Sequence, residues 1–267
     1  MTSHRFVSAP AGRPAAPAGA SLARAGLLAY GIGSYVVGVA ALVAVILASL
    51  DVYAFTNSPV AIANPLVAGL FNVGLLVLFG AQHSIMARAA FKERWTRIIH
   101  PAMERSTFVL ATGLVLLPLV ALWQPLPAVV WSWSSPVARA TATGIGLLGW
   151  TYLFLATFAI DHFELFGLQQ SWLGFRGRPP VAVAFRERWM YRVDRHPIMT
   201  GVLVGLWATP EMTVGRLLFA AGLSLYVVIG VHFEERALRR QWGDVYRSYR
   251  RRVPALVPTV PSSKATE

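Results

Sequence analysis

The chain has 267 residues, of which 55% are hydrophobic and only 13% are charged. A soluble domain usually carries charge on about a quarter of its residues, so this composition excludes an ordinary soluble protein and indicates a bundle surrounded by lipid. The formal net charge is +12, but the basic residues lie between apolar runs, a pattern typical of loops beside anionic headgroups, which argues against nucleic acid as a partner. Cysteine is absent, which excludes disulfides, thiolate metal sites and covalent thiol catalysis.

The two ends of the chain differ from its middle. Residues 1–24 are rich in Ala, Pro and Gly and lack an apolar core followed by a cleavage site, which predicts a disordered cytoplasmic tail and not a signal peptide. Residues 25–254 form the predicted membrane domain. Residues 255–267 are expected to be a second disordered tail.

Six apolar runs follow one another in the membrane domain. The first four reach or approach the roughly 20 residues that span a bilayer. The last two are separated by a turn signal, Pro210 to Thr213, and the first of them is short enough for a thin or re-entrant segment. We therefore predict an all-α polytopic bundle of five or six helices that ends in a helical hairpin, with its apolar runs at Ala25–Leu50, Ile62–Met86, Thr107–Trp123, Ala142–Ile160, Ile198–Thr209 and Val214–His232.

The basic residues predict the orientation. All of the 24 Lys and Arg residues except Arg139 and Arg216 fall on one side of a six-span topology. By the positive-inside rule, this distribution places both termini in the cytoplasm of a bacterium, with the chain in the inner membrane. The long connection Asp161–His196 lies on the same side and is too aromatic for a disordered loop, so we expect it to carry function.

Histidines gather at the helix ends on this basic side. They do not recur at short helical spacings, so no metal site is predicted. His83, in Gln82-His83-Ser84, is either an interfacial cap or part of a cavity that opens to the cytoplasm. In Asp161-His162-Phe163-Glu164, the two carboxylates share one helical face, which suits a base with an orienting partner, although solvated residues at the end of a span would look the same.

Two segments near the C-terminus carry the sharpest local pattern. Pro197 forces His196 out of helical geometry and can begin a helix, whose entrance favours anionic groups. Gly201 would let a ligand or a neighbouring helix come close. On the last run, Glu235 can pair with Arg239 four residues on, whereas Glu234 has no such partner. Gly243 followed by Asp244 indicates a helix stop and a new N-cap, so Tyr246 and Tyr249 belong to a short second helix.

This ordered set resembles the C-terminal signature of isoprenylcysteine carboxyl methyltransferases. The whole chain resembles more closely the bacterial methanethiol S-methyltransferases, which are relatives of the NnrU family, and this likeness includes Gln82-His83-Ser84 and the segment from Asp161 to Leu168. The resemblance implies S-adenosylmethionine as methyl donor, methanethiol as the small thiol acceptor, and dimethyl sulfide as product. It assigns a cytoplasmic cofactor site to Arg195, His196, Pro197, Gly201, Glu234, Glu235, Tyr246 and Tyr249.

A small thiol is mostly protonated near neutrality, so a base would help the transfer. We expect His162 to be this base with Asp161 as its orienting partner, and His83 is the second candidate. An isoprenylcysteine or lipid methyltransferase of the same architecture and a non-catalytic, NnrU-like membrane or transport protein remain alternatives. All readings that use the methyl donor require His196 and the two glutamates to converge in space. The sequence carries no signal for oligomeric state.

Overall fold

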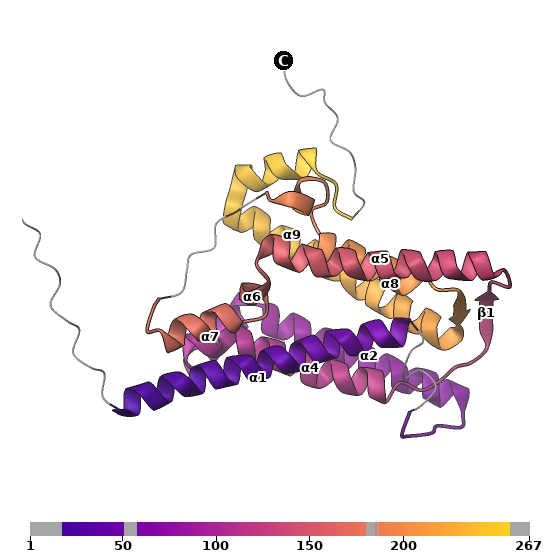
Figure 1. Ribbon diagram of the computed structural model, residues 1–267, viewed down its shortest axis with the longest axis horizontal. Helices are drawn as coiled ribbons and strands as arrows, with labels where there is room; N and C mark the ends of the chain where they lie inside the picture. The colour runs from indigo at the N-terminus through magenta and orange to yellow at the C-terminus, as the bar shows by residue number, and fades with distance from the viewer. Residues whose placement is uncertain (1–17, 51–57, 180–184, 186, 257–267) are drawn as a thin grey trace, which may run out of the picture.

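The structure is a computed structural model that describes residues 18–50, 58–179, 185 and 187–256 (Figure 1). In these ranges, five helices are long and apolar enough to cross a membrane: α1 (Ala18–Ser49), α2 (Pro65–Ala87), α4 (Glu104–Ala121), α5 (Pro136–Ile160) and α9 (Val214–Arg252). A further apolar helix, α8 (Pro197–Trp207), has 11 residues. It rises about 16 Å, roughly half of a bilayer core. The predicted multi-pass helical bundle is confirmed.

The remaining elements lie at the two ends of the bundle. One end, called the basic end below, holds α3 (Ala89–Trp95), η1 (Pro101–Met103), α6 (His162–Leu165), α7 (Leu168–Phe175), η2 (Trp189–Arg192) and the last turns of α9. The other, called the sheet end, holds the antiparallel pair β1 (Val129–Ser132) and β2 (Glu211–Thr213). Arg139 and Arg216 lie at the sheet end, next to these strands.

Local signals in the sequence define where the long helices begin. Asn64 caps α2 by accepting hydrogen bonds from the backbone N–H groups of the first turn, and Ser135 does the same for α5. A proline follows each cap at the first helical position, where its missing N–H costs nothing. Thr213 caps α9 directly after β2. Each of these caps lies at the sheet end.

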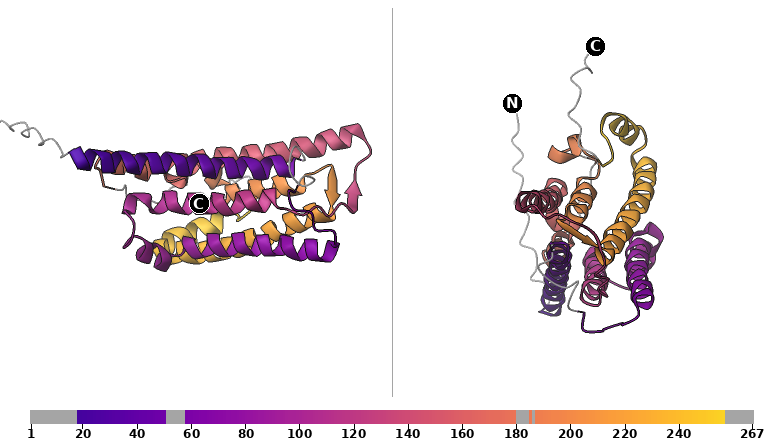
Figure 2. Two further views of the ribbon diagram at one scale, coloured as in Figure 1. Left: turned by 90° about the horizontal axis from the view of Figure 1, so that it is seen from below. Right: turned by 90° about the vertical axis from the view of Figure 1, so that its right-hand side faces the viewer.

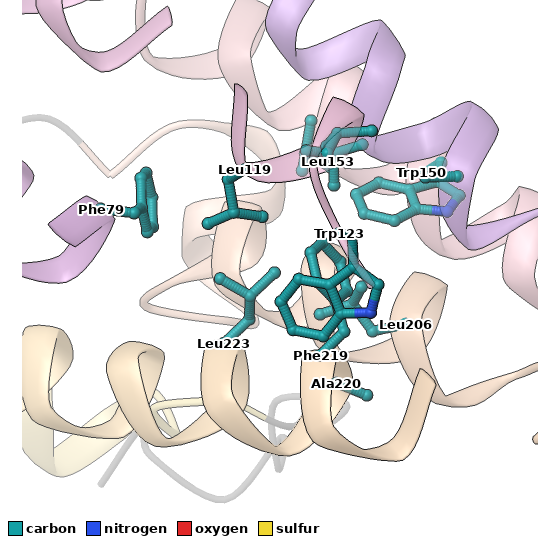
Figure 3. Close-up of a cluster of buried hydrophobic side chains, with 12 residues drawn as sticks. Phe79, Leu119, Trp123, Trp150, Leu153, Leu206, Phe219, Ala220 and Leu223 are labelled. Carbon is teal, nitrogen blue, oxygen red and sulfur yellow. The ribbon is translucent and has the colours of Figure 1, made fainter. Parts of the chain in front are cut away.

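The helices form two packed groups joined by α9. Helices α1, α4 and α2 lie beside one another, α5 packs along α8, and α9 contacts α2 and α8 (Figure 2). A continuous apolar core fills the space between the groups, with Trp123 and Phe219 meeting edge to face at 5.1 Å (Figure 3). This core holds both groups together, so the elements at the basic end have a fixed frame.

Helices α5 and α8 approach each other through glycine. A Cβ atom on Gly201 would lie 2.6 Å from the Gly149 carbonyl oxygen and from the Leu153 backbone nitrogen, and one on Gly149 would lie 2.7 Å from the Gly205 nitrogen. Small residues at such crossings let helix backbones touch, which is the usual way that membrane helices pack. Of the two roles expected for Gly201, the structure therefore shows close contact with a neighbouring helix.

Three details differ from the sequence-based expectations or sharpen them. Helix α1 begins at Ala18, so residues 18–24 are helical and not part of a tail; residues 1–17 and 257–267 lie outside the described residues. The turn between α8 and α9 contains β2, which pairs with β1 some 80 residues earlier, with Glu211 opposite Ser132 and Thr213 opposite Val129. Gly243 adopts φ 52°, which interrupts α9 where a helix stop was predicted.

Candidate active site

The predicted cofactor residues from α8 and α9 meet at the basic end. The Nδ1 atom of His196 lies 3.4 Å from a Glu234 carboxylate oxygen, and its Nε2 atom lies 3.5 Å from Glu235. The imidazole is buried, and Glu235 is buried beside it. Burial acts to lower the pKa of His196, but the two carboxylates outweigh it and raise that pKa above its usual value. The predicted convergence of His196 with the two glutamates is confirmed.

The two glutamates have different surroundings. Glu235 is held by Arg195, whose Nε and NH2 groups donate to one carboxylate oxygen at 2.9 and 2.5 Å, and by Arg250, whose Nε lies 3.1 Å from the other oxygen. The expected pairing of Glu235 with Arg239 is wrong, because Arg239 donates instead to the Glu235 backbone carbonyl at 3.1 Å. The Glu234 side chain is 50% exposed. Glu234 therefore retains acceptor capacity for a ligand.

Arg195 also binds the end of α9. Its NH1 group donates to the carbonyl oxygens of Arg250 and Val253, and its backbone N–H donates to Pro254 at 2.9 Å. These carbonyl groups lie in the last turn of α9, at its C-cap and just beyond it, where a cation is favourable. The N–H groups of Arg195 are thus bound to Glu235 and to the C-terminal segment. Arg195 joins the start of α8 to the end of α9.

An aromatic cluster lies against this ion-pair network. Tyr246 and Tyr249 are 1% and 3% exposed, and they pack with Val253, Phe185 and Trp242. The Tyr249 hydroxyl donates to the Tyr191 carbonyl at 2.6 Å, whereas the Tyr246 hydroxyl is buried and has no hydrogen-bond partner among the described residues. The short aromatic helix predicted after Gly243 is therefore present, and its tyrosines are buried in this cluster.

Asp194 positions His196 through a hydrogen bond to its backbone. Its carboxylate is fully buried and accepts a hydrogen bond from the His196 backbone N–H at 2.9 Å, while the Tyr152 hydroxyl donates to its other oxygen at 3.4 Å. Burial raises the pKa of Asp194, and the hydrogen bonds and His196 partly oppose that rise. Pro197 begins α8 as predicted and is itself fully buried. The imidazole therefore sits on a rigid entrance to α8.

His162 lies in a second buried cluster, between α5 and α1. Its ring stacks on Phe158 at 4.3 Å and is 4% exposed. Thr157 donates its hydroxyl hydrogen to the Phe154 carbonyl, so its oxygen accepts from His162 Nδ1 at 2.8 Å. The network then assigns Nε2 as the acceptor of the Tyr35 hydroxyl at 2.9 Å. His162 is therefore a neutral ring with its basic nitrogen facing Tyr35.

Asp161 does not orient the His162 ring through a hydrogen bond. Its carboxylate caps α6 by accepting a hydrogen bond from the Glu164 backbone N–H at 3.1 Å, and it also accepts one from the Gln169 side chain at 3.0 Å. Burial lowers the pKa of His162, and the Asp161 charge opposes this effect. Thr157 and Tyr35 are the orienting partners, and Asp161 acts on the imidazole only through its charge.

Arg105 binds the segment that follows His162. Its Nε donates to the Leu165 carbonyl at 2.8 Å, and its charge interacts with Glu164 and Glu234. The same guanidinium interacts electrostatically with His83, the second predicted base. The His83 Nδ1 atom lies 3.2 Å from the Thr112 hydroxyl, and its ring lies 4.7 Å from that of Phe108. His83 thus lines the same end of the bundle, in a group separate from His162.

Sequence reasoning missed several residues of these clusters. The structure adds Arg105, Tyr35, Thr157, Asp194 and Arg250 to the predicted set. Asp194 had a local signal, because a carboxylate two residues before His-Pro can accept from the helix entrance. Tyr35 and Thr157 had none, since their roles depend on which helices are neighbours.

The fold and these clusters define a polytopic helical membrane protein with a charged, partly buried site at one end. The chain is 47% identical to the methanethiol S-methyltransferase of Mycobacterium tuberculosis, over 74% of its own length and 82% of the relative's. It is 43% identical to methanethiol S-methyltransferase 2 of Bradyrhizobium diazoefficiens, over 84% and 83% of the two chains. The corresponding enzyme of a Pseudomonas strain is 45% identical, over 79% and 81%. The chain belongs to the methanethiol S-methyltransferase family.

A more distant similarity reaches beyond bacteria. Human nurim is 32% identical over 63% of this chain and 67% of its own length. No family profile matches the chain, and no solved structure is detectably similar to it.

Proposed function

We propose that this protein transfers the methyl group of S-adenosylmethionine to methanethiol and releases dimethyl sulfide. The observation that carries the proposal is the meeting of His196 with Glu234 and Glu235 at the entrance of α8. The family to which the chain belongs, with relatives named for methanethiol methylation, supports the choice of substrate.

The residues present fit a cationic, hydroxyl-bearing donor. Glu234 offers carboxylate oxygens to an amino group or to ribose hydroxyls, and the buried Tyr246 hydroxyl has no partner among the described residues. In this proposal, the other predicted cofactor residues keep the donor site rigid: Arg195, Pro197, Gly201, Glu235 and Tyr249. When bound, S-adenosylmethionine supplies a methyl group on a positively charged sulfur, which attracts carboxylates and aromatic faces.

The chain's own residues supply the proton acceptor for the thiol. A thiol placed against the Tyr35 hydroxyl passes its proton to that oxygen, while Tyr35 passes its own hydrogen to His162 Nε2. The 2.9 Å hydrogen bond between Tyr35 and Nε2 is already formed for this second transfer. The nearby Asp161 charge favours the resulting imidazolium. The thiolate then needs only to be held in line with the methyl group of the donor, because positioning supplies much of the rate of such a transfer.

We further propose that the basic end faces the cytoplasm of a bacterium. Among the described Lys and Arg residues, all except Arg139 and Arg216 lie at this end, and the inner membrane with both termini inside follows from the positive-inside rule. Val214 and Glu235 are separated by about 31 Å of helix rise, roughly one hydrocarbon core, so α9 carries the two glutamates to the membrane surface. A water-soluble donor would reach the site from that side.

Headspace analysis of cells that express the chain and receive methanethiol tests the proposal. Dimethyl sulfide is expected from the natural sequence and not from Glu234→Gln, with both proteins present in the membrane at equal amounts. A methylated isoprenyl or lipid product would instead assign the chain to the alternative substrate class. Absence of any methylated product, together with no S-adenosylmethionine binding by calorimetry, would show a non-catalytic protein.

A further inference from the structure

A cavity opens beside the last turn of α5 and shares only Phe158 with the clusters above. It has a volume of about 360 Å³, and its walls are Phe158 and Ala159 of α5 together with Arg188, Trp189 and Arg192. The cavity therefore combines an apolar wall from a membrane-spanning helix with two guanidinium groups from η2 and the residue before it.

The two arginines leave the cavity with uncompensated positive charge. The Arg188 side chain makes no hydrogen bond or ion pair with any described residue, and the Arg192 side chain donates only from Nε to the Glu187 carbonyl, at 3.4 Å. The Glu187 carboxylate is already bound to Arg252 at 2.8 Å. Two cations beside one cavity favour an anion that carries several acceptor oxygens, such as a phosphate group.

The surroundings of the cavity indicate what carries that phosphate. The exposed side chains of Phe158, Phe154 and Leu147 lie four and then seven residues apart along α5, which places them on one face of the helix from the cavity toward the middle of the bundle. Trp189 is 74% exposed and adopts φ 45°, an unfavourable conformation for a large side chain. Exposed tryptophan is typical of the headgroup level of a membrane.

We propose that this cavity binds an anionic phospholipid, with the phosphate between Arg188 and Arg192 and an acyl chain along the Phe158–Phe154–Leu147 face of α5. Because η2 leads within two residues to Asp194, lipid bound here fixes the segment that carries His196. The inference does not depend on the proposed methyl transfer.

Native mass spectrometry of the detergent-purified protein, with phosphatidylglycerol or phosphatidylcholine added, tests this proposal. The natural sequence is expected to retain phosphatidylglycerol in preference to phosphatidylcholine. In R188Q/R192Q, retention of phosphatidylglycerol should fall about 30-fold, equivalent to about 2 kcal/mol at about 1 kcal/mol for each cation. R188K/R192K should restore much of it, because the charges return.

The matched control is R94Q/R97Q, which removes two exposed arginines from the same end of the bundle, away from the cavity. It should retain phosphatidylglycerol like the natural sequence. Equal retention in R188Q/R192Q, or no preference between the two lipids, would overturn the proposal. So would loss of S-adenosylmethionine binding by R188Q/R192Q in detergent without lipid, since the cavity would then belong to the methyl donor. A photoreactive phosphatidylglycerol should crosslink to peptides that contain residues 188–192.

Discussion

Glu234 and Glu235 are adjacent on α9, yet their side chains have different partners and are expected to respond differently to substitution. Glu235 is buried between Arg195, Arg250 and His196, whereas half of the Glu234 side chain is exposed. Removing one partner of a buried ion pair costs about 3–5 kcal/mol, because the remaining charges stay buried without compensation. The carboxylate of Glu234, by contrast, is available to a ligand.

E235Q should therefore lower the melting temperature of the purified protein strongly, whereas E234Q should lower it much less while abolishing S-adenosylmethionine binding. Thermal unfolding in detergent and calorimetric titration of each variant separate the two effects. If E234Q unfolds as easily as E235Q, then the two side chains share one structural role, and the assignment of Glu234 to the ligand fails.

The hydrogen bonds around His162 predict how activity depends on pH. Burial lowers the pKa of His162 below its usual 6.5, so the neutral ring that accepts a proton persists as the pH falls through 6.5. The activity of the natural sequence should decline only below that value. H162Q and Y35F should each lower kcat about 100-fold, with donor affinity unchanged.

D161N supplies the matched test of the charge effect. Asp161 favours the protonated imidazole, so its loss should move the acid limb of the kcat/KM profile to still lower pH. A profile that shifts upward, or that does not move while Y35F is fully active, would exclude His162 as the proton acceptor and leave His83 as the candidate.

The surroundings of His196 predict that the stability of the folded protein falls as the pH rises. Its pKa is raised in the folded protein, because the nearby carboxylates outweigh its burial. The folded state then binds more protons than the unfolded state above pH 6.5, so the contribution of His196 is complete below 6.5 and is lost as the pH rises through its folded pKa. The stability difference between the natural sequence and H196Q, measured by melting from pH 5.5 to 9, should shrink with rising pH. A constant or growing difference would contradict the raised pKa.

At the scale of single residues, sequence reasoning found groups whose partners are local or whose backbone is unusual. His196 before Pro197 and Gly243 before Asp244 are such cases, because proline and glycine restrict or release the chain wherever they occur. The contacts of Tyr35 and Arg105 were not predicted from the sequence. Each joins helices far apart in the chain, Tyr35 to His162 and Arg105 to Leu165, and only the packed bundle determines those pairs.

The helices themselves were largely predictable. Long apolar runs must become helices in lipid because every backbone group needs an internal partner, and this holds regardless of neighbours. The strands β1 and β2 were not predictable, since segments of four and three residues acquire ladder hydrogen bonds only from each other. The place of α8 also depends on packing, because 11 residues cannot define a span by length.

The α5–α8 contact gives a prediction at the scale of the element. A Cβ on Gly201 would meet backbone atoms of α5 at 2.6 Å, so G201A must push the two helices apart and should cost about 1–3 kcal/mol. Because α8 carries His196 at its first turn, donor affinity should fall together with the melting temperature.

G144A is the matched control for this change. Gly144 is on α5, and nothing lies within 4 Å of a Cβ placed there. Alanine is the better helix former, so G144A should be neutral or slightly stabilising. Equal melting temperatures for G201A and G144A would show that the α5–α8 contact is looser than the structure indicates.

At the scale of the whole molecule, five long helices and the shorter α8 run between the basic end and the sheet end, so the proposed topology puts these two ends on opposite sides of the membrane. The absence of cysteine makes this arrangement simple to test, because a single introduced thiol is the only target for a maleimide. Glu93 is exposed at the basic end, and Ser134 is exposed at the sheet end, two residues after β1. Neither residue contributes to the clusters described above.

In intact cells whose outer membrane is made permeable, a membrane-impermeant maleimide should label S134C at once and E93C only after the inner membrane is disrupted. The physical reason is the charge distribution: inverting the bundle would carry more than a dozen arginines across the lipid, at about 2.5 kcal/mol or more for each charge inserted. Labelling of E93C before disruption, with S134C protected, would reverse the orientation. It would also place Glu234 and His196 outside the cytoplasm, away from the supply of S-adenosylmethionine, and the proposed methyl transfer would then lack its donor.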